Sequence, residues 1–380
     1  MSGLYIHIPF CKQACSYCDF YFLTRQQLRQ PFVDALVREI NSYRDSKFSA
    51  DLVQTVYIGG GTPSLLNERQ LSAIFDAIDD VFDLDPVEIT MEMNPDDVTE
   101  DYLRMIRGLG VNRASMGVQS FQEEILRFMH RAHSRDEAFN ALEALQKANF
   151  PSFTADLIYG NPGQTLDMLE KDIEQLAKFN PPHISAYSLT VEPKTRLGKQ
   201  VQLGRIEPPD DDVVSDHFDL VRDKLAGYGI EQYEVSNFAK PGKEAVHNSN
   251  YWRHKNYLGL GPSANSFWWG DKSAKRWRNK LDITSYLKNE PGDYQEEEEN
   301  LTLHALAEER LMLGLRTKWG VSRKNLSEMY DYNLNEDQEE WLVDQVQKGM
   351  IKCDGDTIIM TSDGLKVSDY LIVQFLSCQP

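Results

Sequence analysis

Apolar residues follow two alternating patterns over the first half of the chain. Short β-favouring runs are each followed by a segment whose apolar residues recur at helical spacing, as in 30–43. These patterns predict strands at 4–9, 55–58, 87–93, 113–119, 153–159 and 184–190. They predict helices between the strands at 30–43, 70–81, 100–109, 135–148 and 166–179.

Strands that alternate with helices in this way are typical of parallel sheets with crossover helices, either a barrel or a doubly wound sheet. Periodicity does not separate the two. In a barrel, functional residues gather at the carboxyl ends of the strands. The conspicuous residues here follow the strands in that way: the loop with Cys11, the glycine run 59–61, Glu92, Gln119 and Asp156. We therefore expect an α/β fold with a partial (β/α)6 TIM-like barrel over 1–207.

The rest of the chain is less regular. A helix at 212–225 and an aromatic-rich stretch at 228–277 suggest an extension of the barrel over 208–290. The acidic segment 290–300 is expected to be an exposed connector. Helices at 303–315, 336–348 and 365–376, with a hairpin at 351–360, predict a small C-terminal α+β domain, winged-helix-like, over 301–380.

Composition places the chain among globular proteins. Of 380 residues, 41% are hydrophobic and 11% aromatic, which excludes a disordered chain. Forty basic against 59 acidic residues leave a net charge of −19, and a field of that sign repels nucleic acid. No run approaches the ~20 apolar residues that span a bilayer, and the start lacks the basic region of a signal peptide. We expect a cytoplasmic protein that does not bind nucleic acid.

The cysteines are unevenly placed. Cys11, Cys15 and Cys18 are close together, while Cys353 and Cys378 lie near the end with no ligand set beside them. An odd group of three does not resemble a disulfide framework. Structural zinc needs a fourth ligand, so zinc held by three thiolates is the lesser alternative. Three thiolates on a [4Fe-4S] cluster would leave one iron without a protein ligand, which is a place for chemistry.

The segment from Cys11 to Cys18, with Tyr17 before the last cysteine, resembles the C-x-x-x-C-x-x-C signature of radical S-adenosylmethionine (SAM) proteins. The Gly-Gly-Gly-Thr-Pro run at 59–63, Glu-Met-Asn-Pro at 92–95 and Gly-Val-Gln-Ser-Phe at 117–121 strengthen this likeness. It extends from Tyr5 to the last helix. Within the superfamily the chain is similar to the subgroup around oxygen-independent coproporphyrinogen III oxidase, and most similar to the HemW-type heme chaperones in that subgroup.

This resemblance implies that Cys11, Cys15 and Cys18 hold three irons of a [4Fe-4S] cluster, with SAM on the fourth. The glycines would let the backbone approach the bound methionine, and Arg131 would donate to its carboxylate. The residues implied to contact SAM are Tyr5, Tyr17, Gly60, Gly61, Thr62, Glu92, Gln119, Arg131 and Asp156. Taken singly, each has a plainer interpretation as a turn, a helix cap or a surface charge.

Two departures from the oxidase pattern argue against decarboxylation. Phe20 stands where the oxidase has a further cysteine, and the segment before the first cysteine is short. The run His-Asn-Ser-Asn-Tyr-Trp at 247–252 matches a motif of the heme chaperones. It makes His247 the first candidate for a heme ligand, followed by His254 and Tyr251. The plainer alternative is a hydrogen-bonded core histidine.

The function that the resemblance implies is binding of heme and its transfer to acceptor proteins, a membrane-associated acceptor being one candidate. The cofactors would be the [4Fe-4S] cluster, SAM and heme. The first alternative is an oxygen-independent coproporphyrinogen III oxidase, a radical oxidative decarboxylase. The second is a zinc-binding regulator with a winged-helix module.

Overall fold

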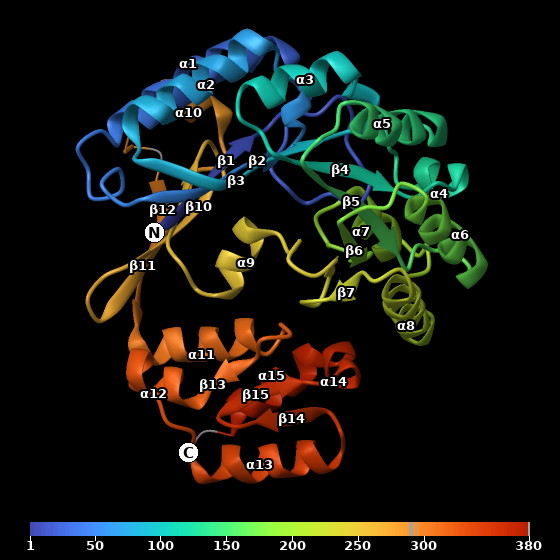
Figure 1. Cartoon of the computed structure of the whole chain (residues 1–380), viewed down its shortest axis with the longest axis vertical. Coiled ribbons are helices and arrows are strands. Elements are labelled where there is room, and N and C mark those ends of the chain that lie inside the picture. Colours follow the sequence, from blue (N-terminus) through green and yellow to red (C-terminus); the bar gives the residue numbers. More distant parts are fainter. Residues whose placement is uncertain (289–291, 294, 379–380) are drawn as a thin grey trace.

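The computed structural model describes residues 1–288, 292–293 and 295–378. Its centre is a curved sheet in which six consecutive strands lie side by side and run parallel (Figure 1). They are β1 (Ser2–Ile8), β2 (Val53–Gly60), β3 (Leu84–Met93), β4 (Arg113–Gln119), β5 (Ser152–Tyr159) and β6 (His183–Ser188). The predicted partial (β/α)6 barrel is confirmed.

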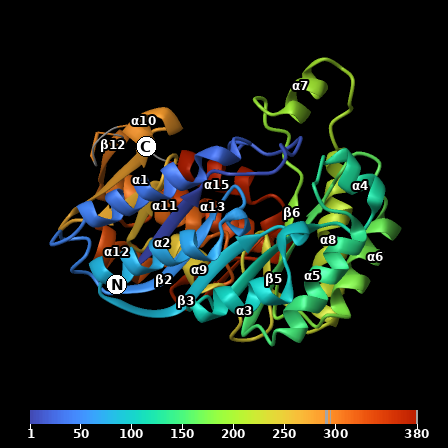
Figure 2. The same ribbon diagram turned by 90° about the horizontal axis from the view of Figure 1, so that it is seen from above.

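Helices connect these strands and cover the outer face of the sheet (Figure 1). Several begin with a capping box, in which an Asn, Ser or Thr side chain accepts from the backbone of the first turn. One short helix, α7, stands away from the sheet (Figure 2). No helix in the described ranges has both the length and the apolar character to cross a bilayer. The helices are α1 (Arg29–Ser42), α2 (Glu68–Val81), α3 (Glu100–Gly108), α4 (Glu123–Phe128), α5 (Arg135–Lys147), α6 (Leu166–Ala177), α7 (Arg196–Gln202) and α8 (Asp211–Gly227), with 3₁₀ turns at Gln26–Leu28, Pro63–Leu65 and Pro95–Asp97.

The barrel strands present different chemistry on their two faces. On β4, Ala114, Met116 and Val118 are fully buried in the main hydrophobic core. The alternate residues Arg113 and Ser115 line a cavity instead, since successive side chains of a strand point to opposite faces. Barrel interiors are commonly filled by Val, Ile and Leu. The polar inner face here leaves room for a ligand.

Further strands extend the sheet at both edges. β8 pairs antiparallel with β6 and β7 pairs antiparallel with β8, while β9 adds parallel to β1 and is followed by β10, β11 and β12. A short helix, α9, lies on the concave side (Figure 1). The elements are β7 (Glu231–Gln232), β8 (Asn237–Ala239), α9 (Val246–Trp252), β9 (Tyr257–Leu260), β10 (Asn265–Trp269), β11 (Ser273–Asn279), α10 (Ile283–Lys288) and β12 (Gln295–Thr302).

The acidic segment is exposed over 297–300 as predicted, but its described part is not a connector. Residues 295–302 form the edge strand β12, while 290, 291 and 294 lie outside the described residues. The neighbouring strand β11 supplies cations: Lys275 pairs with Glu298, Arg276 with Glu299, and Arg278 with the glutamates at 296 and 297. The glutamates of this charge run are therefore paired with cations of the neighbouring strand.

The C-terminal part is a small α+β module, as expected. Its three-stranded antiparallel sheet has the order β13-β15-β14. Its core includes Phe267 of β10 and Ala274 of β11, so it is continuous with the extended sheet. The division at 207, 290 and 301 stays a prediction. The elements are α11 (Leu303–Gly314), β13 (Val321–Ser322), α12 (Arg323–Tyr330), α13 (Glu336–Gln347), β14 (Ile351–Asp354), β15 (Thr357–Met360), α14 (Ser362–Lys366) and α15 (Ser368–Ser377).

A buried carboxyl group joins the barrel to the extension. Glu39 of α1, 1% exposed, accepts from the backbone N–H of Gly261 at 2.8 Å, the Asn279 side chain at 2.8 Å and the Tyr286 hydroxyl at 2.6 Å. Burial raises the pKa of Glu39 to about 7, although these three donors oppose the rise.

We predict that Glu39 makes the fold less stable as the pH rises. Its carboxyl binds a proton more tightly when folded, so stability falls between its ordinary pKa of about 4.5 and about 7. From pH 5.5 to 8 the free energy of unfolding of the wild type, relative to that of Glu39→Gln, should fall by about 2 kcal/mol. Urea denaturation at both pH values measures this change. Glu124→Gln, at an exposed position, keeps Glu39 and should show the same pH slope as the wild type. Equal pH slopes for wild type and Glu39→Gln would contradict the prediction.

Candidate functional site

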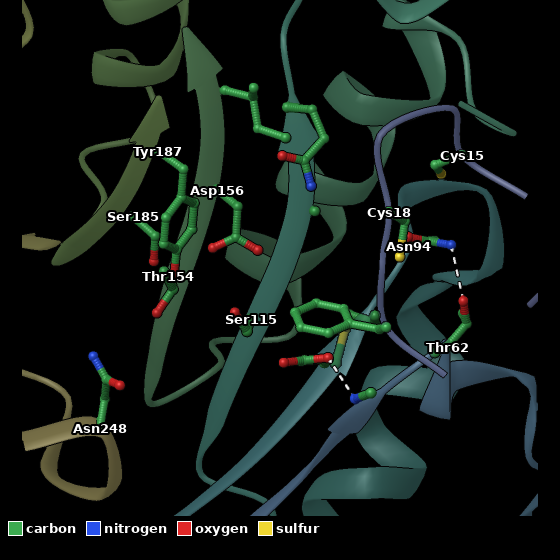
Figure 3. Close-up of a pocket in the computed structure, with 18 of the residues that line it drawn as sticks. Cys15, Cys18, Thr62, Asn94, Ser115, Thr154, Asp156, Ser185, Tyr187 and Asn248 are labelled. Carbon is green, nitrogen blue, oxygen red and sulfur yellow. Dashed lines mark hydrogen bonds between the residues drawn. The ribbon is translucent and has the colours of Figure 1, made fainter. Parts of the chain in front are cut away.

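A cavity of about 620 Å³ lies on the concave side of the barrel. Its walls are the inward side chains of β1 to β6, the loop after β1 and helix α9 (Figure 3). The volume falls within the roughly 300–1,000 Å³ of small-molecule sites. This is the structure's candidate site.

The structure brings all but one of the predicted site residues to this cavity. Segments far apart in the chain meet there because consecutive parallel strands end at one side of the sheet. The predicted residues that line it are Tyr5, Cys11, Cys15, Tyr17, Cys18, Gly60, Gly61, Thr62, Glu92, Gln119, Arg131, Asp156, His247 and Tyr251. Sequence reasoning missed further polar residues, namely Asn94, Arg113, Ser115, Thr154, His183, Ser185, Tyr187 and Asn248. Most of these occupy alternate positions on the predicted strands, a signal that could have found them.

The loop that carries the three cysteines is fixed at several points. The Cys11 N–H donates to the carbonyl of Leu23 at 2.9 Å, and the Ser16 N–H donates to that of Met129 at 3.0 Å. Burial raises the pKa of Cys11 to about 11 and that of Cys18 to about 12, and repulsion between neighbouring thiolates adds to both. Without a cation the two groups are therefore thiols at neutral pH. Within the described ranges, no group of three His, Cys, Asp or Glu residues is placed to hold a single metal ion.

Arg131 connects this loop to the barrel. One terminal nitrogen lies 3.4 Å from Cys15 Sγ and 3.4 Å from the Tyr17 hydroxyl, and the other donates to Asn94 at 2.8 Å and to the Gly117 carbonyl at 3.0 Å. Burial alone would lower the pKa of Arg131, but Tyr17 and Cys15 outweigh burial and raise it. Its Nε is buried without a partner in the described structure. A fixed positive charge thus lies beside the cysteines.

Acidic and amide groups line the neighbouring wall. Glu92 accepts from the Tyr57 hydroxyl at 2.6 Å and from the Gly60 N–H at 3.0 Å. Burial raises the pKa of Asp156 to about 7, with Glu92 as the second cause. Gln119 has a φ of 66°, in the left-handed region, and its buried Oε1 has no partner among described residues. Left-handed backbone at a residue other than glycine and unpartnered buried polar groups are features that cluster at functional sites.

The predicted reason for the glycines needs correction. A Cβ on Gly61 would lie 2.7 Å from the carbonyl oxygen of Phe10, and one on Gly60 would meet the His7 ring at 2.5 Å. Both added Cβ atoms would therefore lie against β1 and the start of the loop that follows it. Gly60 also has a φ of 107°, which favours glycine. The two glycines therefore let β2 and the cysteine loop pack closely, while their backbone borders the cavity.

The two candidate histidines lie in different places. His247 is buried and both ring nitrogens are engaged, Nδ1 with Thr55 Oγ1 at 2.9 Å and Nε2 with the Tyr251 hydroxyl at 2.8 Å. Burial lowers its pKa to about 3, so the imidazole is neutral. His254 does not line the cavity, and its inclusion in the site is wrong. Its ring stacks on Phe267 and contacts the Tyr330 hydroxyl, so it belongs to the junction with the C-terminal module.

Known proteins resemble the chain over its whole length. The model of the radical SAM superfamily matches residues 5–176. A protein of Bacillus subtilis named heme chaperone HemW is 35% identical over 99% of both chains. Its namesake in Lactococcus lactis is 34% identical over 99% of this chain and 97% of that protein. The chain belongs to the HemW family of radical SAM proteins. Membership of the radical SAM superfamily implies an iron–sulfur cluster and SAM as cofactors.

A solved structure supports the fold of this HemW family member. Coproporphyrinogen III oxidase (HemN) of Escherichia coli superposes with a TM-score of 0.84 over 98% of this chain and 89% of that one, at 24% identity. At that identity the match describes the fold alone. The HemW assignment rests on the full-length sequence relatives.

We predict that Gly61→Ala destabilises the protein by roughly 1–3 kcal/mol, because the methyl group meets backbone that cannot move aside freely. Gly108→Ala at the end of α3 is the matched control, since a Cβ there meets nothing within 4 Å. Urea denaturation of both variants measures the difference. Equal stability of Gly61→Ala and the wild type would show that the loop can shift away from β2.

Proposed function

We propose that this protein binds heme and transfers it to acceptor proteins, and that it carries a [4Fe-4S] cluster and SAM in the same cavity. The full-length relatives are named as heme chaperones, which supports the heme part. The observation that carries the proposal is that a histidine–tyrosine pair, His247 and Tyr251, opens onto the cavity that also contains the three cysteines.

The donor set suits a cluster. Cys11, Cys15 and Cys18 all line the cavity, and soft thiolates are the ligands that iron–sulfur clusters take. The raised pKa values of Cys11 and Cys18 mean that a bound cationic centre would displace the protons of these two thiols on binding. Arg131 beside Cys15 would offset the negative charge of the thiolates. Three protein ligands leave one iron for SAM.

The wall next to the cysteines suits SAM. The unpartnered Oε1 of Gln119 and Nε of Arg131 offer an acceptor and a donor. The carboxyl groups of Glu92 and Asp156 are suited to an ammonium or to ribose hydroxyls. When bound beside a reduced cluster, SAM supplies a 5′-deoxyadenosyl radical. In this proposal the chain's own residues orient the cofactor and exclude water.

The heme part of the proposal uses His247 and aromatic side chains. Imidazole is the common ligand of heme iron, and Phe20, which lines the cavity while 66% exposed, offers a ring at its edge. The bond from His247 Nε2 to Tyr251 must break before that nitrogen can bind iron. This competition weakens the ligation, which suits a protein that must release heme to acceptors, membrane-associated proteins among them.

We predict that replacing any one of Cys11, Cys15 and Cys18 with Ala removes most of the cluster. The remaining two thiolates and the open fourth position cannot hold a cubane against exchange. Iron and sulfide per chain, measured after anaerobic reconstitution, report the loss. Cys353→Ala replaces an exposed cysteine and should retain wild-type content. Wild-type iron and sulfide content in a variant that lacks any one of the three cysteines would overturn the cluster assignment.

We predict that hemin added to the reconstituted protein gives a Soret shift that saturates at a stoichiometric ratio. His247→Ala should weaken binding on the order of tenfold or more, equivalent to about 1.4 kcal/mol. Tyr251→Phe frees Nε2 and should bind at least as tightly as the wild type. His304→Ala, at an exposed histidine on α11, is the control.

Absence of a saturable shift in the wild type would exclude heme binding. A parallel anaerobic incubation with reductant, SAM and coproporphyrinogen III tests the oxidase alternative. Release of protoporphyrinogen with consumption of SAM would favour that alternative, whereas a Soret shift without turnover supports the proposal. Wild-type affinity in His247→Ala would leave heme binding intact and move the ligand to another residue.

A further inference from the structure

The end of the cavity away from the cysteines is a ring of buried polar side chains. The strand register places Thr90 of β3 beside Arg113 of β4, and Thr154 of β5 beside His183 of β6. All four line the cavity and none is more than 4% exposed. In Figure 3, Thr154 and Asn248 lie on the side opposite Cys15 and Cys18.

Arg113 has a buried positive charge that no carboxylate neutralises at contact distance. Its recorded hydrogen bond is to the Thr154 hydroxyl at 2.6 Å, and no acidic residue in the described ranges forms an ion pair with it. Asp156 lies four residues further along β5 than Ser152, the register partner of Arg113, and Arg113 is only a small cause among those that act on the pKa of Asp156. A desolvated guanidinium without a counter-charge is costly, so an anion would bind favourably beside it.

The neighbours of Arg113 offer further unpartnered groups. Thr90 Oγ1 and His183 Nδ1 are buried without partners among the described residues. The Tyr233 hydroxyl accepts from the Ala245 N–H at 3.3 Å and lies 2.8 Å from His183 Nε2. In the tautomer in which Tyr233 donates to Nε2, Nδ1 carries the proton of the neutral imidazole and can donate to a ligand. Burial and Arg113 both lower the pKa of His183, which agrees with a neutral ring.

We propose that Arg113, Thr90 and His183 form a carboxylate-binding recess that holds one propionate of heme. The proposal rests on the proposed heme function and adds the group by which the ligand is anchored. A guanidinium pairs with a carboxylate through two parallel hydrogen bonds, and the hydroxyl and the imidazole N–H complete a set of donors. The acidic wall at Glu92 and Asp156 would repel the same carboxylate, so the recess also selects an orientation.

The methionine carboxylate of SAM carries the same chemistry, and the experiment separates the two sources. Hemin, hemin dimethyl ester and SAM are each titrated into anaerobically reconstituted wild type and Arg113→Gln. Loss of a charged hydrogen-bonding pair is expected to weaken hemin binding by about 10- to 100-fold. The wild type should bind the dimethyl ester more weakly than hemin, whereas Arg113→Gln should bind the two alike. SAM affinity and iron content should not change.

Arg104→Gln removes the same charge from the exposed face of α3 and should leave hemin affinity unchanged. Equal wild-type affinity for hemin and its dimethyl ester would overturn the recess, and this comparison needs no variant to fold. Wild-type hemin affinity in Arg113→Gln would also overturn it, as would a loss confined to SAM. No hemin binding by the wild type would instead refute the heme function on which the recess depends.

Discussion

The arrangement of the site depends on the contacts of one buried group, the Arg131 guanidinium. It contacts Cys15 and Tyr17 in the cysteine loop, Asn94 after β3 and Gly117 on β4. Through these contacts one side chain joins the loop to β4 and to the residue that follows β3. Because the charge is desolvated, its short hydrogen bonds to Asn94 at 2.8 Å and to the Gly117 carbonyl at 3.0 Å hold the guanidinium in place, and Cys15 and Tyr17 lie 3.4 Å from its other terminal nitrogen. These contacts set where the thiols stand relative to the carboxyl groups of the neighbouring wall, and the close approach of Gly61 to Phe10 holds the loop from the other side.

The two faces of the barrel strands separate stability from chemistry. Outward residues such as Met116 and Val118 pack under the helices in one large core, which supplies most of the hydrophobic stabilisation. Inward residues such as Ser115 and Asp156 contribute little to that core. A substitution on the inner face can therefore change what the cavity binds without loss of the fold, as long as it does not leave a buried charge unpaired. Glu39 differs from these inward residues. It is a buried carboxyl on α1 that joins this helix to the sheet extension.

Much of the barrel could be predicted from the sequence because local patterns determine it. The strand–helix alternation gave all six barrel strands, and the motifs at their ends gave residues that do line one cavity. Three features depend on contacts that no local pattern contains. The glutamates at 296–299 are a strand because cations of β11 face them. His254 faces Tyr330 although it lies close to His247 in the chain. The glycines at 60 and 61 face β1 and its loop, a packing that only the fold reveals.

The edge strand β12, at one end of the large sheet, affects how copies of this protein can associate at high concentration. Any open sheet edge exposes backbone groups that can pair with a strand of another molecule. On β12 the residues at 297–299 are exposed glutamates, and the positive residues that balance them belong to the strand inside. A second β12 brought alongside would meet carboxylates with carboxylates. The edge therefore discourages edge-to-edge assembly of identical chains and protects the protein against aggregation.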